Sequence, residues 1–109
     1  MDRFEAAEKM HLRAIEIKEE ILGKEDYEVA LSVGHLASLY NYDMGKFREA
    51  EMLYLRSIKI NLNLFGPTCA GLAYEYRGLI NVIIEVSKNH QNTPRNVSGV
   101  SGNREPPET

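Results

Sequence analysis

The sequence repeats itself, and this repeat constrains the fold more than any other feature. Residues 47–60 resemble residues 4–17 at an offset of 43 residues, from Phe4 to Phe47, and the same offset continues further along the chain. Identical residues stand at Phe4/Phe47, Ala7/Ala50, Glu8/Glu51, Leu12/Leu55, Arg13/Arg56, Ile15/Ile58, Ile17/Ile60, Gly23/Gly66, Ala30/Ala73 and Leu36/Leu79. A period of this length is typical of a solenoid, in which each unit packs on its neighbours.

Apolar residues recur at three- and four-residue steps in four segments, which predicts amphipathic helices over residues 4–22, 27–43, 47–65 and 69–87. Gly23 is suited to end the first helix, because glycine adopts the left-handed conformation without penalty. Asp26 is suited to cap the second. The predicted core stripes of the first, second and fourth helices are Phe4, Ala7, Met10, His11, Ala14, Ile17 and Ile21; Val29, Val33, Leu36, Ala37 and Tyr40; and Ala73, Tyr76, Leu79, Ile80 and Ile83.

The repeat divides the chain into two parts. Residues 1–88 form the all-α repeat segment, and residues 89–109 are rich in Asn, Ser, Gly and Pro, so we expect them to be a disordered tail. In this register the chain begins in the second helix of one repeat, contains one full repeat and ends with the first helix of another. We therefore expect a fragment, a truncated isoform or an open-ended piece, with two apolar faces left open.

Composition argues against several classes of function. The net charge of −3 does not favour nucleic acid, and no apolar run approaches the ~20 residues of a membrane span. Cys69 is the single cysteine, which fits a reducing, cytoplasmic compartment. His11, His35 and His90 are scattered over separate segments. We expect no catalytic centre, no cofactor and no metal site, because each requires clustered side chains.

Two phrases carry a family resemblance. They are Val33-x-x-Leu36-Ala37-x-x-Tyr40 and Gly45-Lys46-Phe47-x-x-Ala50-Glu51-x-x-Tyr54-x-x-Ser57. Together they resemble the tetratricopeptide repeat, a helical hairpin whose small residues let the two helices approach closely. The resemblance implies an α-solenoid of such hairpins. Ser57 stands where that repeat has alanine, and Ile80 takes a small-residue position, which should push the last helix pair apart.

The long connection between Ala14 and Ala30 resembles the kinesin light chain type of this repeat. Within that group, the phrases from Ala7 to Met44 and from Tyr76 to Ile80 are similar to a microtubule-associated adaptor. That similarity implies a binding module without catalysis. It implies as partners the cytoplasmic tail of the amyloid precursor protein, microtubules and the subunits of a cullin–RING ubiquitin ligase. It also implies a cytoplasmic location, with cytoskeletal or membrane association and a nuclear pool as alternatives.

If such a solenoid keeps a peptide groove, the first helix of each hairpin lines it. The candidate groove residues are Leu31, Gly34, His35, Ser38, Asn41, Tyr42, Tyr74, Arg77 and Asn81. Arg77 and Asn81 lie one turn apart and are suited to hold a peptide carboxylate or backbone, since arginine makes planar bidentate contacts. Alternatively, Arg77 is a surface residue paired with Glu75 or with water.

Two candidate residues have equally plain structural interpretations. Gly34 in mid-helix indicates either the close approach of a neighbouring helix or room for a ligand backbone. His35 is either a groove residue or an ordinary surface or interhelix histidine. Two functions therefore stay open from the sequence: a peptide-binding adaptor, or a structural piece that oligomerises through its open solenoid ends and binds no peptide of its own.

Overall fold

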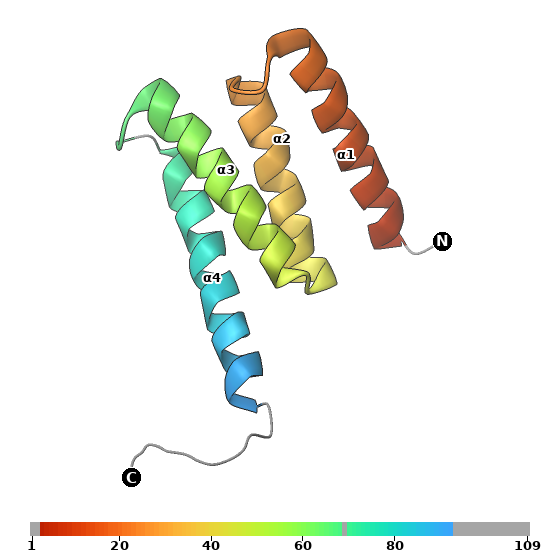
Figure 1. The fold of residues 1–109 in the computed structure, drawn as a ribbon, viewed down its shortest axis with the longest axis vertical. Helices are drawn as coiled ribbons and strands as arrows, with labels where there is room; N and C mark the ends of the chain where they lie inside the picture. The colour runs from red at the N-terminus through yellow and green to blue at the C-terminus, as the bar shows by residue number, and fades with distance from the viewer. Residues whose placement is uncertain (1–2, 69, 93–109) are drawn as a thin grey trace.

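Successive antiparallel helices lie side by side in the computed structural model, which describes residues 3–68 and 70–92 (Figure 1). Their bounds are α1 Arg3–Leu22, α2 Tyr27–Ser38, the π-helical turn η1 Leu39–Met44, α3 Phe47–Phe65 and α4 Gly71–Asn92. Each helix packs on its neighbours in sequence, with α1 at one edge and α4 at the other. This arrangement confirms the predicted all-α solenoid.

The predicted boundaries hold for most elements. Residues 47–65 were predicted as a helix and are α3, and α1 begins one residue earlier than expected. Helix α4 continues to Asn92, so residues 89–92, which we expected in the disordered tail, are helical. The rest of the predicted tail, residues 93–109, and Cys69 lie outside the described residues.

The second predicted helix is divided. It is α-helical only to Ser38 and continues as a π-helical turn that ends at Gly45, whose φ of 68° favours glycine. Asn41 lies in this turn, is buried, and donates hydrogen bonds from Nδ2 to the Gly78 carbonyl oxygen (3.1 Å) and to Tyr54 Oη (3.2 Å). Contacts with α3 and α4 therefore hold a turn that local periodicity does not predict. Such π-helical turns are frequent at functional sites.

The predicted stripe of α2 is confirmed as the centre of the core. Val29, Val33, Leu36, Ala37 and Tyr40 are all buried, because α2 lies between α1 and α3. From α3, the core cluster includes the small Ala50 and the large Tyr54, both with no exposed surface. This combination of small and large side chains allows two antiparallel helices to interdigitate without voids.

The predicted stripes of α1 and α4 are partly wrong. In α4, Tyr76, Ile80 and Ile83 are exposed by 44%, 57% and 54%, and Ala73 is exposed too. The buried positions of α4 are instead Leu72, Glu75, Gly78 and Val82, with Leu79 half-buried. In α1, Met10, Ile17 and Ile21 are exposed, whereas Phe4, Ala7, His11, Ala14 and Ile15 are buried or half-buried. Both helices carry two apolar faces, and only one face of each is covered.

The N-terminus of α2 permits a direct test of the local structure. Asp26 caps it as predicted, with Oδ1 accepting a hydrogen bond of 2.8 Å from the Glu28 amide. Replacing Asp26 by alanine is expected to lower the free energy of unfolding by about 1 kcal/mol, because the amide loses its partner. Urea denaturation followed by circular dichroism measures this change. Asp43→Ala, at an exposed position in η1, is the control and should change the stability little.

Candidate functional site

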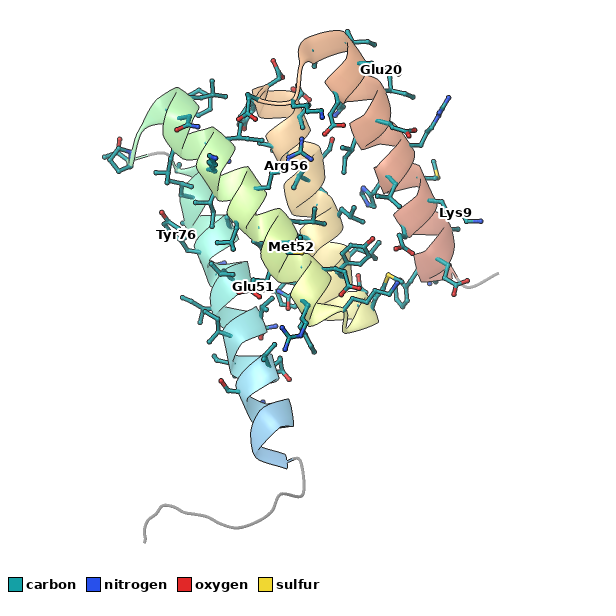
Figure 2. All side chains as sticks on the ribbon, in the orientation of Figure 1. Lys9, Glu20, Glu51, Met52, Arg56 and Tyr76 are labelled. Carbon is teal, nitrogen blue, oxygen red and sulfur yellow. The ribbon has the colours of Figure 1, made fainter. Side chains whose placement is uncertain are left out.

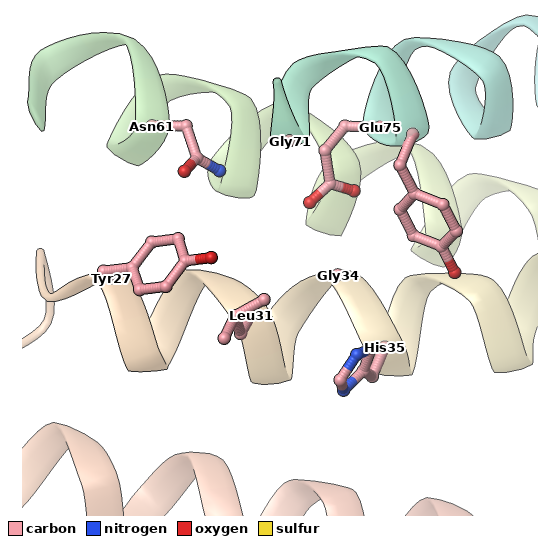
Figure 3. A pocket seen from close by; sticks show the side chains of 8 residues that line it. Tyr27, Leu31, Gly34, His35, Asn61, Gly71 and Glu75 are labelled. Atoms are coloured by element: carbon pink, nitrogen blue, oxygen red, sulfur yellow. The ribbon is translucent and has the colours of Figure 1, made fainter. Parts of the chain in front are cut away.

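A cavity opens between α2 and α4 at the level of Glu75. Its volume is about 180 Å³. It is lined by Tyr27, Leu31, Gly34, His35, Asn61, Gly71, Tyr74 and Glu75. Asn61 of α3 and Glu75 of α4 point toward α2, where Tyr27 and Leu31 lie (Figure 3). The cavity therefore has a mostly apolar wall on the α2 side and two polar side chains on the other.

Glu75 is the unusual member of this lining. Only 5% of the residue is exposed, and among the described side chains its Oε1 is a buried atom without a hydrogen-bond partner. The other oxygen, Oε2, accepts a hydrogen bond from the Ser57 hydroxyl. Burial raises the pKa of the Glu75 carboxyl, and the Ser57 hydrogen bond opposes this rise. A buried acceptor without a partner is costly, and such a group commonly marks a functional position.

The absence of a side chain at Gly34 leaves room for the Glu75 carboxylate. A Cβ at this position would lie 2.6 Å from Glu75 Oε2, closer than real contacts allow. Gly34 therefore makes room for a side chain of α4, which is neither the helix backbone nor the ligand backbone that its two interpretations named. Ser57 Oγ also lies 3.2 Å from the Ala30 carbonyl oxygen, so one hydroxyl contacts α2 and α4 from α3 beside the carboxylate.

Four of the predicted groove residues meet in a polar network beside the cavity. Asn81 Nδ2 donates to Asn41 Oδ1 at 2.8 Å, and Ser38 Oγ shares hydrogen bonds with Tyr54 Oη (3.2 Å) and Tyr74 Oη. Tyr54 ties this network to α3, because Asn41 donates to its hydroxyl as well. The structure thus brings Ser38, Asn41, Tyr74 and Asn81 together, and the network fixes the relative positions of α2, η1 and α4.

The remaining predicted residues lie around the network and the cavity. Leu31, Gly34 and His35 line the cavity, and Tyr42 and Arg77 are exposed. Glu75 points inward to Ser57, so the suggested surface pair of Glu75 with Arg77 is wrong; no described residue forms an ion pair with Arg77. His35 also lies near α1. Burial, followed by the charge of His35, lowers the pKa of His11.

Sequence reasoning missed Glu75, Tyr27, Asn61 and Gly71 as parts of the site. One signal for Glu75 was present: the 43-residue offset pairs it with Ser32, a buried position of α2. A carboxylate at a position that is small and buried in the preceding repeat indicates a special environment. The other three residues carried no such signal.

The opposite side of the solenoid has a charged cleft that is larger than the cavity beside Glu75. A cleft of about 550 Å³ runs between α1 and α3 and is lined by Lys9, Leu12, Arg13, Ile15, Glu16, Glu19 and Arg56. Figure 2 shows Met52 and Arg56 along α3 on this side. Arg56 donates to Glu19 across the cleft, and Arg13 pairs with Glu16 at 3.4 Å. Both carboxylates of the cleft are thus paired, so this cleft offers a ligand less than the cavity beside Glu75 does.

Within residues 3–68 and 70–92, no group of three His, Cys, Asp or Glu side chains is placed to hold a metal ion. No helix of that part is long and apolar enough to cross a membrane.

Comparison with known proteins agrees with this architecture. The family model described as Tetratricopeptide repeat matches residues 1–79, which is most of the chain and includes α1 to α3 and the first turns of α4. No curated protein matches the sequence. The helical hairpins, their order and the family match agree, and the chain belongs to the tetratricopeptide repeat family, whose hairpins form modules for protein–protein interaction.

Proposed function

We propose that this chain binds a peptide segment of a partner protein in the groove between α2 and α4. The observation that carries the proposal is the buried, unpartnered Oε1 of Glu75 at the wall of the cavity. A ligand that places a hydrogen-bond donor there recovers an interaction that the protein alone leaves unmade. The groove is preorganised by the Ser38–Asn41–Tyr54–Asn81 network, which lowers the entropic cost of binding.

The lining favours one kind of donor. Tyr27 and Leu31 of α2 offer apolar surface, and the Glu75 carboxylate lies on the opposite side of the cavity (Figure 3). A lysine side chain has the matching distribution, with an apolar stem and a charged end group. Its ammonium group would also supply the opposite charge that stabilises ionised Glu75. We therefore assign the cavity to a lysine of the bound peptide.

Arg77 supplies a second expected contact. Its exposed guanidinium has no ion-pair partner among the described residues. Arg77 lies three positions from Tyr74, which lines the cavity, and residues at this spacing share a helix face. Arg77 is therefore available for a carboxylate of the peptide, which arginine binds in bidentate geometry. Asn81 is less suited to this role than the sequence suggested, because its amide already donates to Asn41.

The finer role rests on sequence resemblance. The phrases Ala7 to Met44 and Tyr76 to Ile80 resemble amyloid protein-binding protein 2, a member of the kinesin light chain type of the family. On that basis the bound segments include the cytoplasmic tail of the amyloid precursor protein, in transport along microtubules, and substrates of a cullin–RING ubiquitin ligase. The same basis gives a cytoplasmic location with cytoskeletal or membrane association and a nuclear pool.

Peptide titration tests the cavity assignment. A fluorescent peptide with one lysine and a free C-terminus is titrated with the protein and followed by anisotropy, beside the same peptide with norleucine at that position. Glu75→Gln is expected to weaken binding of the lysine peptide by about tenfold or more, because the ammonium loses its counter-charge. The norleucine peptide should bind more weakly and respond little to this variant.

Controls separate the cavity from the groove as a whole. Glu85→Gln removes a more exposed carboxylate of the same helix, which pairs with Lys88, and should leave both peptides unaffected. Arg77→Ala should weaken the binding of peptides with a free C-terminal carboxylate and should not affect the same peptides with an amidated C-terminus. Equal binding of the lysine and norleucine peptides to all variants would contradict the assignment of the cavity. A tail peptide of the amyloid precursor protein, used as a third probe, tests the resemblance separately.

A further inference from the structure

Two apolar helix faces are uncovered by the part of the chain that the structure describes. One is the face of α4 that carries Tyr76, Ile80 and Ile83, and Tyr76 projects from α4 on the side away from α3 (Figure 2). The other is the face of α1 that carries Met10 and Ile17, exposed by 74% and 41%. These faces lie at opposite edges of the solenoid (Figure 1). Contiguous exposed apolar surface of this kind commonly marks an interaction site.

The internal repeat indicates which kind of helix would pack on the exposed faces of α1 and α4. At the 43-residue offset, α1 corresponds to α3 and α2 corresponds to α4. One contact position is shared. Ser32 of α2 accepts from Lys18 of α1 at 3.0 Å, and its repeat equivalent, Glu75 of α4, accepts from Ser57 of α3, although the equivalent of Lys18 is Asn61 and not Ser57. The pair α1–α2 is therefore repeated as α3–α4. By the same rule, the pair α2–α3 would be repeated by α4 and another α1-like helix.

The open face of α4 is the repeat equivalent of a covered face. Ala30, Val33 and Ala37 of α2 and Tyr40 of η1 are buried, because α2 and η1 contact both α1 and α3. The Ala30 carbonyl contacts Ser57 of α3, and Tyr40 Oη donates to Glu8 of α1. Their equivalents on α4 are Ala73, Tyr76, Ile80 and Ile83, all of them exposed. The face of α4 therefore has the residue pattern that neighbouring helices cover within the same chain.

The open face of α1 is likewise the equivalent of a face that α3 buries. Ile60 of α3 is 1% exposed, whereas its equivalent, Ile17, is 41% exposed. Leu53 is half-buried, whereas its equivalent, Met10, is 74% exposed. The equivalent helices α1 and α3 therefore carry the same face, which is covered in α3 and exposed in α1.

The chemical character of the open faces also matches that of their equivalents. On α1, Ile17 is identical to Ile60 and Met10 stands in place of Leu53, and on α4, Tyr76 stands in place of Val33 and Ile80 in place of Ala37. Both open faces therefore stay apolar at the positions that are covered in the other copy of the repeat.

From these correspondences we propose that the chain associates head to tail, with α1 of a second copy packing on the open face of α4 as α3 packs on α2. The occupant of the α4 face is thus a second copy of this chain. Such an interface is heterologous, because each copy contributes a different surface, so association continues beyond the dimer. The interface is distinct from the cavity beside Glu75 and does not depend on peptide binding.

Sedimentation velocity of the 109-residue chain, from low micromolar to near-millimolar concentration, tests the proposal. The average mass is expected to rise with concentration beyond that of a dimer. Ile80→Glu on α4 and Met10→Glu on α1 should each weaken association about 100-fold, because a charge would be buried without a partner. Both side chains are mostly exposed in the single chain, so circular dichroism should show unchanged helix content.

Mixing the variants distinguishes head-to-tail from symmetric pairing. Ile80→Glu retains an intact α1, and Met10→Glu retains an intact α4, so an equimolar mixture should form a dimer that does not grow. Met52→Glu is the matched control: Met52 lies on α3, is 71% exposed, and should associate like the unaltered chain. A chain that stays monomeric at every concentration overturns the proposal. So does normal association of Met10→Glu when Ile80→Glu is impaired, which would indicate that two α4 faces pair.

Discussion

Replacing Tyr54 by alanine is expected to lower the free energy of unfolding by about 3–5 kcal/mol, the range for a large aromatic side chain removed from a packed core. Tyr54 has no exposed surface and joins α3 to two other elements, because its hydroxyl bonds Ser38 and Asn41. The substitution leaves a cavity and removes a partner from both polar residues. Small domains have a total stability of only about 5–15 kcal/mol, so urea denaturation should show an early transition.

Gly78 sharpens this test, because it lies where the Tyr54 ring meets α4. A Cβ on Gly78 would overlap the ring and hydroxyl of Tyr54. Gly78→Ala alone should therefore cost about 1–3 kcal/mol, despite the better helix propensity of alanine. Combined with Tyr54→Ala, the clash disappears, and the double variant should be clearly more stable than the sum of the two single effects predicts. Additive effects would show that Tyr54 and Gly78 do not touch in solution.

Replacing Glu75 by glutamine is expected to stabilise the free protein at pH 7 by about 1–3 kcal/mol, because a neutral amide costs less to bury than a charged carboxylate. Burial raises the pKa of Glu75 above its usual value of 4.5, so the folded state favours the protonated carboxyl. The stability that this protonation contributes is fully present below about pH 4.5 and is lost as the pH rises through the folded-state pKa. The advantage of Glu75→Gln should therefore be largest at neutral pH and shrink toward pH 4.

Urea denaturation of both proteins across this pH range measures the difference. Glu85→Gln is the control, because it removes a half-buried carboxylate of the same helix that pairs with Lys88. A stability difference that does not change with pH would contradict the inferred burial of an ionisable group. Peptide affinity should change in the opposite direction to stability, because the same substitution should weaken binding of the lysine peptide. A variant that is more stable and yet binds less tightly is the result expected of a residue kept for function.

The predicted groove shows which features of a site helical periodicity can predict and which it cannot. The sequence placed Ser38, Asn41, Tyr74 and Asn81 on the groove side of two helices, since positions three and four apart share a helix face. It did not predict that they bond one another, because Asn41 reaches Gly78 and Asn81 only from a π-helical turn. Side-chain partners on different helices depend on how those helices cross, which no local periodicity contains.

The sequence by itself determined the helices, their order and the family. Those features follow from local rules: apolar periodicity, the cap at Asp26, the left-handed Gly23, and a period that requires neighbouring hairpins to stack. Only the tertiary structure decided which face of an element is covered. Helix α4 has one apolar face with Leu72 and Val82 and another with Tyr76 and Ile80, and α3 covers the first.

The same limit applies to the site. Glu75 resembles an ordinary charged surface residue in the sequence, and it is buried because Gly34 leaves room for its carboxylate and Ser57 donates to it. The contributing residues lie on three helices and are up to 41 positions apart, from Gly34 to Glu75. Burial depends on what packs against a residue from other elements, so it is a property of the assembled helices and not of any one segment.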